Sequence, residues 1–122
     1  MKLNHITLNI KSMEASLKFY NKLLRLPIQH RFTPYPGTEI VFLGDEGMAV
    51  ELICREEQHN VSFGEDISIG FAVESLEAIR ALLSENGIAC GETITAGLQT
   101  RFFFVKDPDG VNVQFIEQGK PT

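Results

Sequence analysis

The chain has 122 residues, a length that fits one folded domain of ordinary size and argues against a solenoid or a two-domain enzyme. Hydrophobic residues make up 43% and charged residues 22%, close to the averages for globular proteins, which excludes disordered, collagen-like and coiled-coil classes. Lys and Arg total 11 against 16 Asp and Glu, a formal charge of -5, so we expect no nucleic-acid partner.

The lengths of the apolar stretches and the number of cysteines indicate where in the cell the protein is expected. No apolar run approaches the roughly 20 residues that cross a bilayer, and the amino-terminal residues alternate instead of forming a signal-peptide core. We therefore expect no membrane partner and a cytoplasmic location. Cys54 and Cys90 are too few for a disulfide framework or a metal-ligand quartet, and we interpret them as reduced thiols.

The first half reads as one strand, one helix and three strands. Apolar residues alternate with polar ones over 3–10, which predicts a strand with one covered face. The polar side chains turned away from that cover are His5, Thr7 and Asn9. Ser12 is a suitable N-cap for a helix that ends before Pro27. Its expected buried stripe is Met13, Leu17, Tyr20 and Leu24, and strands are expected over 28–33, 38–43 and 48–55.

The second half repeats this order after a polar linker. We expect a strand over 67–73 and a helix that is capped by Ser75 and closes near Asn86 and Gly87. Three further strands are expected over 89–95, 101–105 and 111–117. The predicted boundaries are a first module over about 1–55, a linker over about 56–65 and a second module over about 66–118, all within a single domain spanning 1–122.

An internal duplication accounts for the repeated order. When the chain is shifted by 63 residues, residues 10–15 fall on 73–78 and residues 46–53 fall on 109–116. His5 then corresponds to Ser68, and Glu51 corresponds to Gln114. A sheet with one helix covers only one of its faces, so the other face must meet a second sheet or a ligand. We expect the two modules to pair, either within one chain or by exchange between two chains, and these four side chains to converge between them.

The sequence resembles the vicinal oxygen chelate superfamily, the glyoxalase, bleomycin-resistance and dioxygenase group. The resemblance covers nearly the whole chain and rests on the order and spacing of four segments, 4–10, 16–24, 50–52 and 104–110. It implies an α+β fold of two tandem βαβββ modules that form a U-shaped cleft or half-barrel. It also implies a small-molecule ligand or substrate, often with one divalent metal, and a homodimer is compatible with the pairing.

The family's four metal-ligand positions fall on His5, Glu51, Ser68 and Gln114. The first two match the family pattern, whereas Ser68 and Gln114 stand where metal enzymes of the family commonly have His and Glu. A serine hydroxyl is a poor ligand and an amide oxygen a modest one. The resemblance therefore implies a weakened site in which His5, Glu51 and Gln114 hold Zn²⁺, Ni²⁺, Mn²⁺ or Fe²⁺, or in which no metal is bound.

Other residues have competing interpretations. Glu51 lies between Val50 and Leu52, so its carboxylate needs a partner, solvent or a cation, and it is also the candidate catalytic residue. The candidate substrate-binding residues are Ser68, Arg101 and Asn112. Arg101 could bind an anionic group in bidentate fashion, or it could be an ordinary surface arginine at the start of a strand.

Two functions from different classes remain open. The first is a metal-assisted lyase, isomerase or dioxygenase acting on a small oxygen-bearing substrate, with Glu51 moving a proton. The second is a metal-free binding protein of the bleomycin-resistance kind, in which His5 and Glu51 form an ion pair that shapes the pocket. The sequence names no substrate.

Overall fold

The computed structural model describes residues 1–45, 47–57, 60–97 and 99–118. The chain divides into two compact units, Met1–Ser62 and Phe63–Thr122, and the boundary falls inside the segment expected to be the linker. Residues 58 and 59 of that expected linker lie outside the described residues. Each unit is described by itself below.

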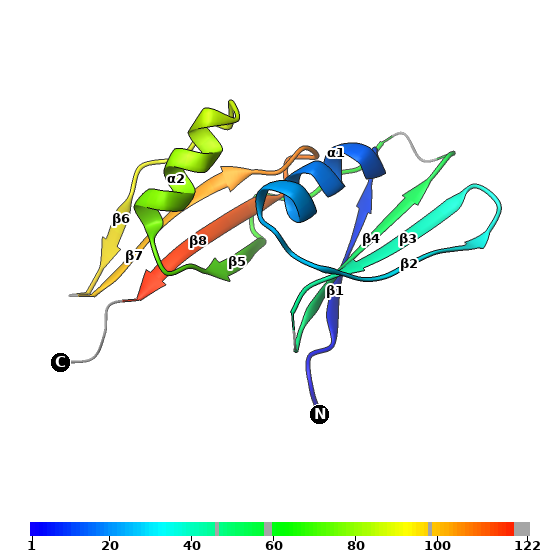
Figure 1. The fold of residues 1–122 in the computed structure, drawn as a ribbon, viewed down its shortest axis with the longest axis horizontal. Coiled ribbons are helices and arrows are strands. Elements are labelled where there is room, and N and C mark those ends of the chain that lie inside the picture. The colour runs from blue at the N-terminus through cyan, green and yellow to red at the C-terminus, as the bar shows by residue number, and fades with distance from the viewer. Residues whose placement is uncertain (46, 58–59, 98, 119–122) are drawn as a thin grey trace. The chain divides into compact units, whose positions relative to one another are not determined.

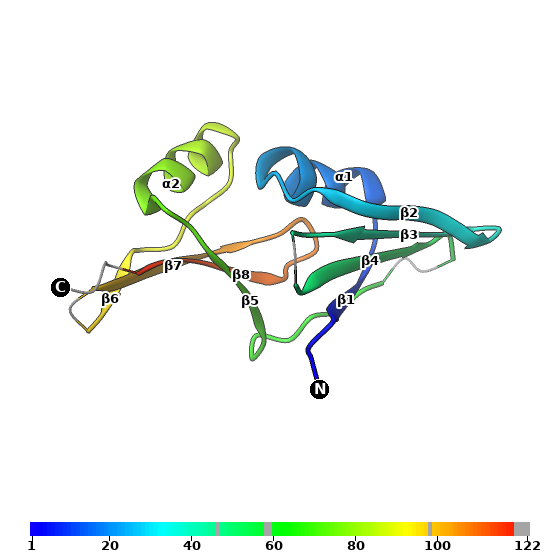
Figure 2. The ribbon, with the colours of Figure 1, turned by 60° about the horizontal axis from the view of Figure 1, so that its bottom comes forward.

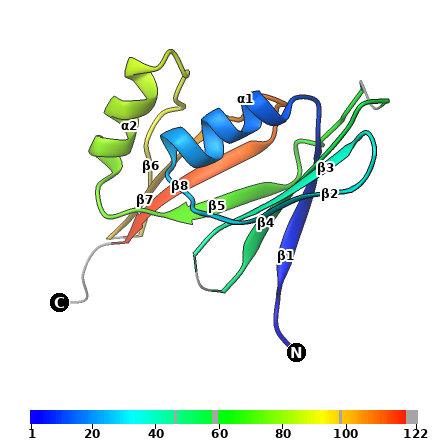
Figure 3. The same ribbon diagram turned by 45° about the vertical axis from the view of Figure 1, so that its right-hand side comes forward.

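The first unit contains a four-stranded mixed sheet (Figure 1). Its elements are β1 (His5–Ile10), α1 (Met13–Leu17), η1 (Lys18–Leu23), β2 (Ile28–Tyr35), β3 (Thr38–Leu43) and β4 (Ala49–Arg55). The strand order is β1-β4-β3-β2, with β1 parallel to β4 and the other neighbours antiparallel. The cyan hairpin of β2 and β3 can be followed in Figures 1 and 3.

The second unit repeats this topology. Its elements are β5 (Ser68–Ala72), α2 (Leu76–Glu85), β6 (Ile94–Ala96), β7 (Thr100–Lys106) and β8 (Asn112–Gln118). The strand order β5-β8-β7-β6 is that of the first sheet, again with one parallel and two antiparallel neighbours. The predicted α+β class with two βαβββ modules is therefore confirmed.

The strand registers agree with the duplication. Thr7 pairs with Glu51 between β1 and β4, and Gly70 pairs with Gln114 between β5 and β8, so both positions are separated by 63 residues. The sequence offset between β3 and its counterpart β7 is one residue shorter. Phe42 of β3 faces Glu51, and the residue that faces Gln114 from β7 is Phe104, 62 positions after Phe42. The slip in the repeat therefore falls between the opening strand and the third strand of the module.

Both helices begin at the predicted caps. The Ser12 hydroxyl accepts a hydrogen bond from the Ala15 backbone at 3.1 Å, and the Ser75 hydroxyl accepts one from Ala78 at the same distance. These bonds satisfy backbone donors that have no partner within the helix. α1 contacts β4 and α2 contacts β8, and Figure 2 shows each helix over one face of its own sheet.

The buried stripe of the first helix differs from the prediction. After Leu17 the helix continues as the π-helical segment η1, whose wider turn changes which residues face the sheet. Tyr20 is fully buried as expected, but its neighbour Phe19 is also buried at 3% exposure. Leu17 and Leu24, two members of the predicted stripe, are only half-buried.

The strand predicted over 89–95 is shorter and begins later. In the structure only Ile94–Ala96 pair with β7, and residues 88–93 are irregular. Gly91 donates one backbone hydrogen bond to Phe104, while its own carbonyl accepts from Arg80 of α2. The paired part of this segment is therefore limited to Ile94, Thr95 and Ala96, with one isolated backbone bond at Gly91.

The core of each unit lies between the sheet and its helix. In the first unit Val41, Leu43 and Leu52 are completely buried, and in the second Phe103 and Val113 are. Alternate strand residues point to the opposite face, which no helix in the described part of the same unit covers. None of the helices within the described ranges is long and apolar enough to span a bilayer.

Candidate functional site

His5 and Glu51 lie side by side on the face of the first sheet that is opposite to α1. They come from the neighbouring parallel strands β1 and β4, and His5 Nε2 is 3.5 Å from Glu51 Oε1. The Glu51 side chain is 13% exposed and the His5 side chain 36% exposed. The structure therefore brings together the two residues that match the family's metal-ligand pattern.

A hydroxyl group holds the Glu51 carboxylate. Thr7, directly opposite Glu51 in the strand pair, donates from Oγ1 to Glu51 Oε1 at 2.5 Å. Both contacts of the carboxylate with described residues, those to Thr7 and to His5, use this oxygen. A distance of this length is typical of a hydroxyl bound to an ionised carboxylate.

Aromatic rings line the same face beside the pair. The Phe42 ring meets His5 edge-on at a centroid distance of 5.6 Å, and it also contacts His30 at 6.3 Å. Phe32 stacks on Phe42 with centroids 6.5 Å apart. Edge-on and offset contacts of this kind are the favoured arrangements of aromatic pairs. The aromatic side chains of β2 and β3 therefore form the apolar surface beside the His5 and Glu51 pair.

The pair has the chemistry and spacing of two metal ligands. Imidazole nitrogen and carboxylate oxygen bind divalent ions at about 2.0–2.2 Å, so ligand atoms 3.5 Å apart subtend a roughly tetrahedral angle at an ion between them. Asn4 Nδ2 lies 2.7 Å from the other ring nitrogen, His5 Nδ1. An amide nitrogen donates, so in this arrangement Nδ1 accepts and Nε2 carries the ring proton that faces Glu51. Reversing the Asn4 amide, so that its oxygen accepts from Nδ1, would give Nε2 the lone pair that a metal ion needs. Two positions of a divalent-metal site therefore fit the residues present.

In the second unit, the corresponding open face carries Ser68, Gln114 and Asn112. A Cβ added to Gly70 would be 3.3 Å from Gln114 Oε1, so the absence of a side chain at position 70 leaves room for the amide. Ser68 and Asn112 line a cavity of about 340 Å³ together with Phe104. Three predicted ligand or substrate residues therefore share one face within this unit.

Asn112 also takes part in a polar cluster at the edge of that cavity. Its amide donates to the Glu65 and Ile67 carbonyls at 3.3 and 3.4 Å. Lys106 Nζ contacts both carboxylate oxygens of Glu65 at 2.9 Å. The hydrogen bond from Lys106, with a further one from Asn112, lowers the pKa of the Glu65 carboxyl.

Arg101 occupies the opposite face of the second sheet. It pairs in register with Glu117, and its guanidinium binds the carboxylates of Glu117 and of Glu77 on α2, the latter at 2.9 Å. The hydrogen bond to Glu77 raises the pKa of Arg101. This arrangement favours the alternative of a surface arginine at the start of a strand, because two carboxylates already bind the guanidinium and Ser68 and Asn112 lie on the other face of the sheet.

The predicted ligand set is divided between the two units. His5 and Glu51 belong to the first, and Ser68 and Gln114 to the second, so their convergence stays a prediction. In the described part of the chain, no group of three or more His, Cys, Asp or Glu side chains is placed to hold a metal ion. The predicted trio of His5, Glu51 and Gln114 has only two side chains of these types, since Gln114 is an amide.

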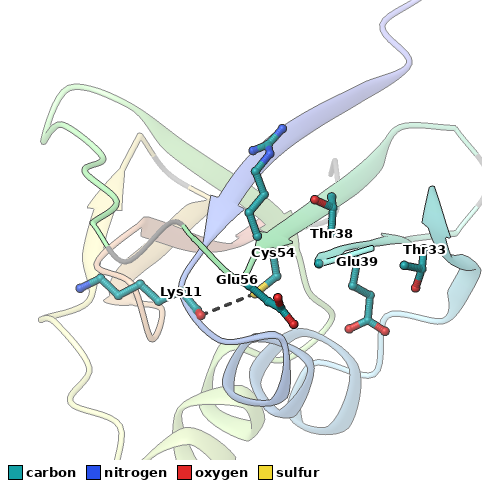
Figure 4. A pocket seen from close by; sticks show the side chains of 8 residues that line it. Lys11, Thr33, Thr38, Glu39, Cys54 and Glu56 are labelled. Atoms are coloured by element: carbon teal, nitrogen blue, oxygen red, sulfur yellow. Dashed lines mark hydrogen bonds between the residues drawn. The ribbon is translucent and has the colours of Figure 1, made fainter. Parts of the chain in front are cut away.

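A separate cavity of about 360 Å³ lies at the far end of the first sheet. It is lined by residues that include Lys11, Glu39, Cys54 and Glu56 (Figure 4). The Cys54 thiol points to the Lys11 backbone carbonyl at 3.5 Å. None of the predicted metal-ligand residues lines this cavity, so we do not assign the candidate functional site to it.

Sequence reasoning missed part of the surroundings of Glu51. Alternation along β1 placed Thr7 on the same face as His5, but the bond from Thr7 to Glu51 depends on the parallel register of two strands far apart in the sequence. Phe42 reaches the site in the same way, by facing Glu51 across β3 and β4. A polar β-branched residue two positions after a candidate ligand was the signal available for Thr7.

The fold is that of a superfamily of small-molecule enzymes and binding proteins. The family model described as "Glyoxalase/Bleomycin resistance protein/Dioxygenase superfamily" matches residues 2–115. The chain therefore belongs to the glyoxalase, bleomycin-resistance and dioxygenase superfamily.

Two proteins are similar to this chain in sequence, and a third is similar in fold. The chain is 32% identical to a trivalent organoarsenical cleaving enzyme of Bacillus sp. (strain MD1), over 95% of this chain and 73% of that protein. It is 28% identical to Glyoxylase I 4 of Arabidopsis thaliana, over 92% and 68%. The crystal structure of TnmS3, an antibiotic binding protein from Streptomyces sp. CB03234, has the same fold, with a TM-score of 0.72, 14% identity and coverage of 98% and 97%.

Proposed function

We propose that this protein binds a small oxygen-bearing molecule and carries out metal-assisted lyase or isomerase chemistry on it. The observation that carries the proposal is the contact of His5 Nε2 with Glu51 Oε1 at 3.5 Å on an open sheet face. Two relatives of 28% and 32% identity are named as a glyoxalase and a cleaving enzyme, which supports an enzymatic function.

In this proposal His5 and Glu51 hold a divalent ion, Zn²⁺, Ni²⁺, Mn²⁺ or Fe²⁺, and Gln114 is the third protein ligand. When bound, the ion supplies Lewis-acid stabilisation of a substrate oxyanion. The Thr7 and His5 contacts engage Oε1, so Glu51 Oε2 is the oxygen available to accept a proton from the substrate. Ser68 and Asn112 bind polar substrate atoms. A homodimer and a cytoplasmic location stay predictions.

A metal-free binding protein is the second candidate. It is favoured by the neutral residues in the second unit, where Ser68 and Gln114 replace stronger ligands and Gln114 extends over Gly70. The antibiotic-binding protein with the same fold supports this class. In that case Thr7, His5 and Glu51 form a hydrogen-bonded cluster that orients polar groups of the ligand.

Metal analysis of protein purified without added ions, together with thermal melting in Zn²⁺, Ni²⁺, Mn²⁺ and Fe²⁺, separates the two candidates. The enzyme proposal expects a raised melting temperature in at least one ion, because a ligand that binds only the folded state stabilises it. This rise should be lost in His5→Ala and Glu51→Gln and reduced in Gln114→Ala.

Glu39→Gln is the matched control for that experiment. Glu39 is also a strand carboxylate of the first unit, but it lies on the helix side of the sheet and pairs with Arg31 at 2.9 Å. Its ion response should equal that of the wild type. If no ion co-purifies and none of the four raises the melting temperature, the metal-assisted function is wrong and the binding protein is favoured.

A further inference from the structure

We propose that Thr7 is a positioning residue that holds the Glu51 carboxylate in its working orientation. The inference rests on the proposed function, in which Glu51 is both ligand and proton acceptor. Thr7 is neither a metal ligand nor a proton acceptor in this proposal. Its hydroxyl affects the substrate or the ion only through Glu51. The contact that carries the inference is the 2.5 Å hydrogen bond from Thr7 Oγ1 to Glu51 Oε1.

The local chemistry gives this bond its effect. A glutamate side chain has three rotatable bonds and loses considerable entropy when it is fixed. Threonine is branched at Cβ and has few χ1 rotamers, so its hydroxyl is a comparatively rigid donor. Since the two residues face each other across parallel strands, the sheet register sets the position of the donor relative to the carboxylate.

The distribution of contacts over the two carboxylate oxygens supports the same reading. Oε1 accepts from Thr7 and faces His5 Nε2, whereas neither contact involves Oε2. The side chain is only 13% exposed, so an unanchored carboxylate would be poorly solvated there. The hydrogen bond therefore fixes the orientation of the carboxylate and leaves Oε2 for a ligand atom or a proton.

The second unit provides an internal comparison. Position 70 corresponds to Thr7 and position 114 to Glu51 in the same parallel register, but residue 70 is glycine. Gln114 Oε1 would lie 3.3 Å from a Cβ at that position, so the amide occupies space that a threonine side chain would take. The duplicated fold does not require a hydroxyl at this register position. The hydroxyl of Thr7 is present in the unit whose opposite residue is the glutamate, and it is absent in the unit whose opposite residue is the glutamine.

The test compares Thr7→Val, which keeps the shape and removes the hydroxyl, with Thr7→Ser, which keeps the hydroxyl. The first readout is the side-chain carboxylate ¹³C resonance of Glu51 in the metal-free protein, assigned by its loss in Glu51→Gln. The second is Mn²⁺ affinity. We expect Thr7→Val to shift the resonance and to weaken Mn²⁺ binding about 10–100-fold, as is typical when a residue that orients a metal ligand is lost. Thr7→Ser should retain both wild-type values.

Thr33→Val is the control, because it makes the same substitution on β2 of the same unit and should change neither readout. Thr7→Ala replaces Thr7→Val if the valine variant does not fold. The inference is overturned if the Glu51 resonance of the folded variant equals that of the wild type, or if Thr7→Ser behaves like Thr7→Val. A shifted resonance would support Thr7 as the positioning residue even if the wild type binds none of Zn²⁺, Ni²⁺, Mn²⁺ and Fe²⁺, and only that failure of all four ions would refute the metal-assisted function.

Discussion

Gly70 lies directly opposite Gln114 in the parallel pair of β5 and β8, and a Cβ at position 70 would be 3.3 Å from the amide oxygen. In the first unit the equivalent pair is Thr7 and Glu51, joined by a short hydrogen bond. At this register position, a threonine hydroxyl binds the glutamate carboxylate in the first unit. In the second unit, a glycine leaves space for the glutamine amide. The duplicated fold has been specialised differently in its two halves.

The close approach at Gly70 predicts an energetic coupling between positions 70 and 114. Replacing glycine by alanine at a compatible backbone angle stabilises a protein by about 0.4–1 kcal/mol, but here the added methyl group crowds Gln114 Oε1. We expect Gly70→Ala to be nearly neutral in the wild type and stabilising in Gln114→Ala. Urea denaturation of the four proteins in this double-mutant cycle measures the coupling, which should be about 0.5 kcal/mol or more. Strict additivity would contradict the expectation.

Asp107 should be needed for stability because it organises the turn between β7 and β8. Its side chain is 5% exposed, and Oδ1 accepts from the backbone of Asp109 at 2.8 Å and of Val111 at 2.9 Å. Asp107→Ala leaves these donors without that acceptor and should lower the free energy of unfolding by about 2 kcal/mol or more. Asp107→Asn keeps Oδ1 and should cost less in the same denaturation experiment. Equal losses would show that the negative charge, and not the acceptor, matters.

The cap of α2 should contribute a measurable part of the stability. Ser75→Ala removes the acceptor for the Ala78 backbone and should cost about 1 kcal/mol in thermal or urea denaturation. Ser75→Asp preserves an acceptor and places a negative charge at the helix N-terminus, so it should be close to the wild type. A loss in Ser75→Asp as large as that in Ser75→Ala would argue against the cap.

The ion pair between Arg101 and Glu77 predicts a pH-dependent contribution to stability. The hydrogen bond from Arg101 lowers the pKa of the Glu77 carboxyl from its ordinary value of 4.5. The folded state therefore binds this proton less readily than the unfolded state. The resulting stabilisation is present above pH 4.5 and is lost as the pH falls through the lowered pKa.

Glu77→Gln should accordingly be less stable than the wild type at pH 7, and the difference should fade as the pH is lowered to about 3. Because both side chains reach the solvent, the effect should also weaken in high salt. Glu85→Gln, which removes a carboxylate at the opposite end of the same helix, is the matched control for the loss of one negative charge. A Glu77→Gln difference that is constant from pH 7 to pH 3 would contradict the prediction.

The sequence by itself determined the repeated topology, both helix caps and the open faces of the strands. These properties follow from local chemistry: alternation sets which side chains share a face, and a serine before a helix satisfies its first backbone donors. The same alternation put His5 and Glu51 on matching faces of their strands, and the internal repeat identified Ser68 and Gln114 as their counterparts.

Only the tertiary structure decided which side chains touch. The register of β1 against β4 gives Glu51 its hydroxyl partner, and the packing of α2 on the second sheet brings Glu77 to Arg101. The π-helical segment that begins at Lys18 and the start of β6 at Ile94 were likewise not indicated by the sequence pattern. Such contacts join residues far apart in the chain, and their geometry is fixed by strand register and helix packing, which local sequence patterns do not encode.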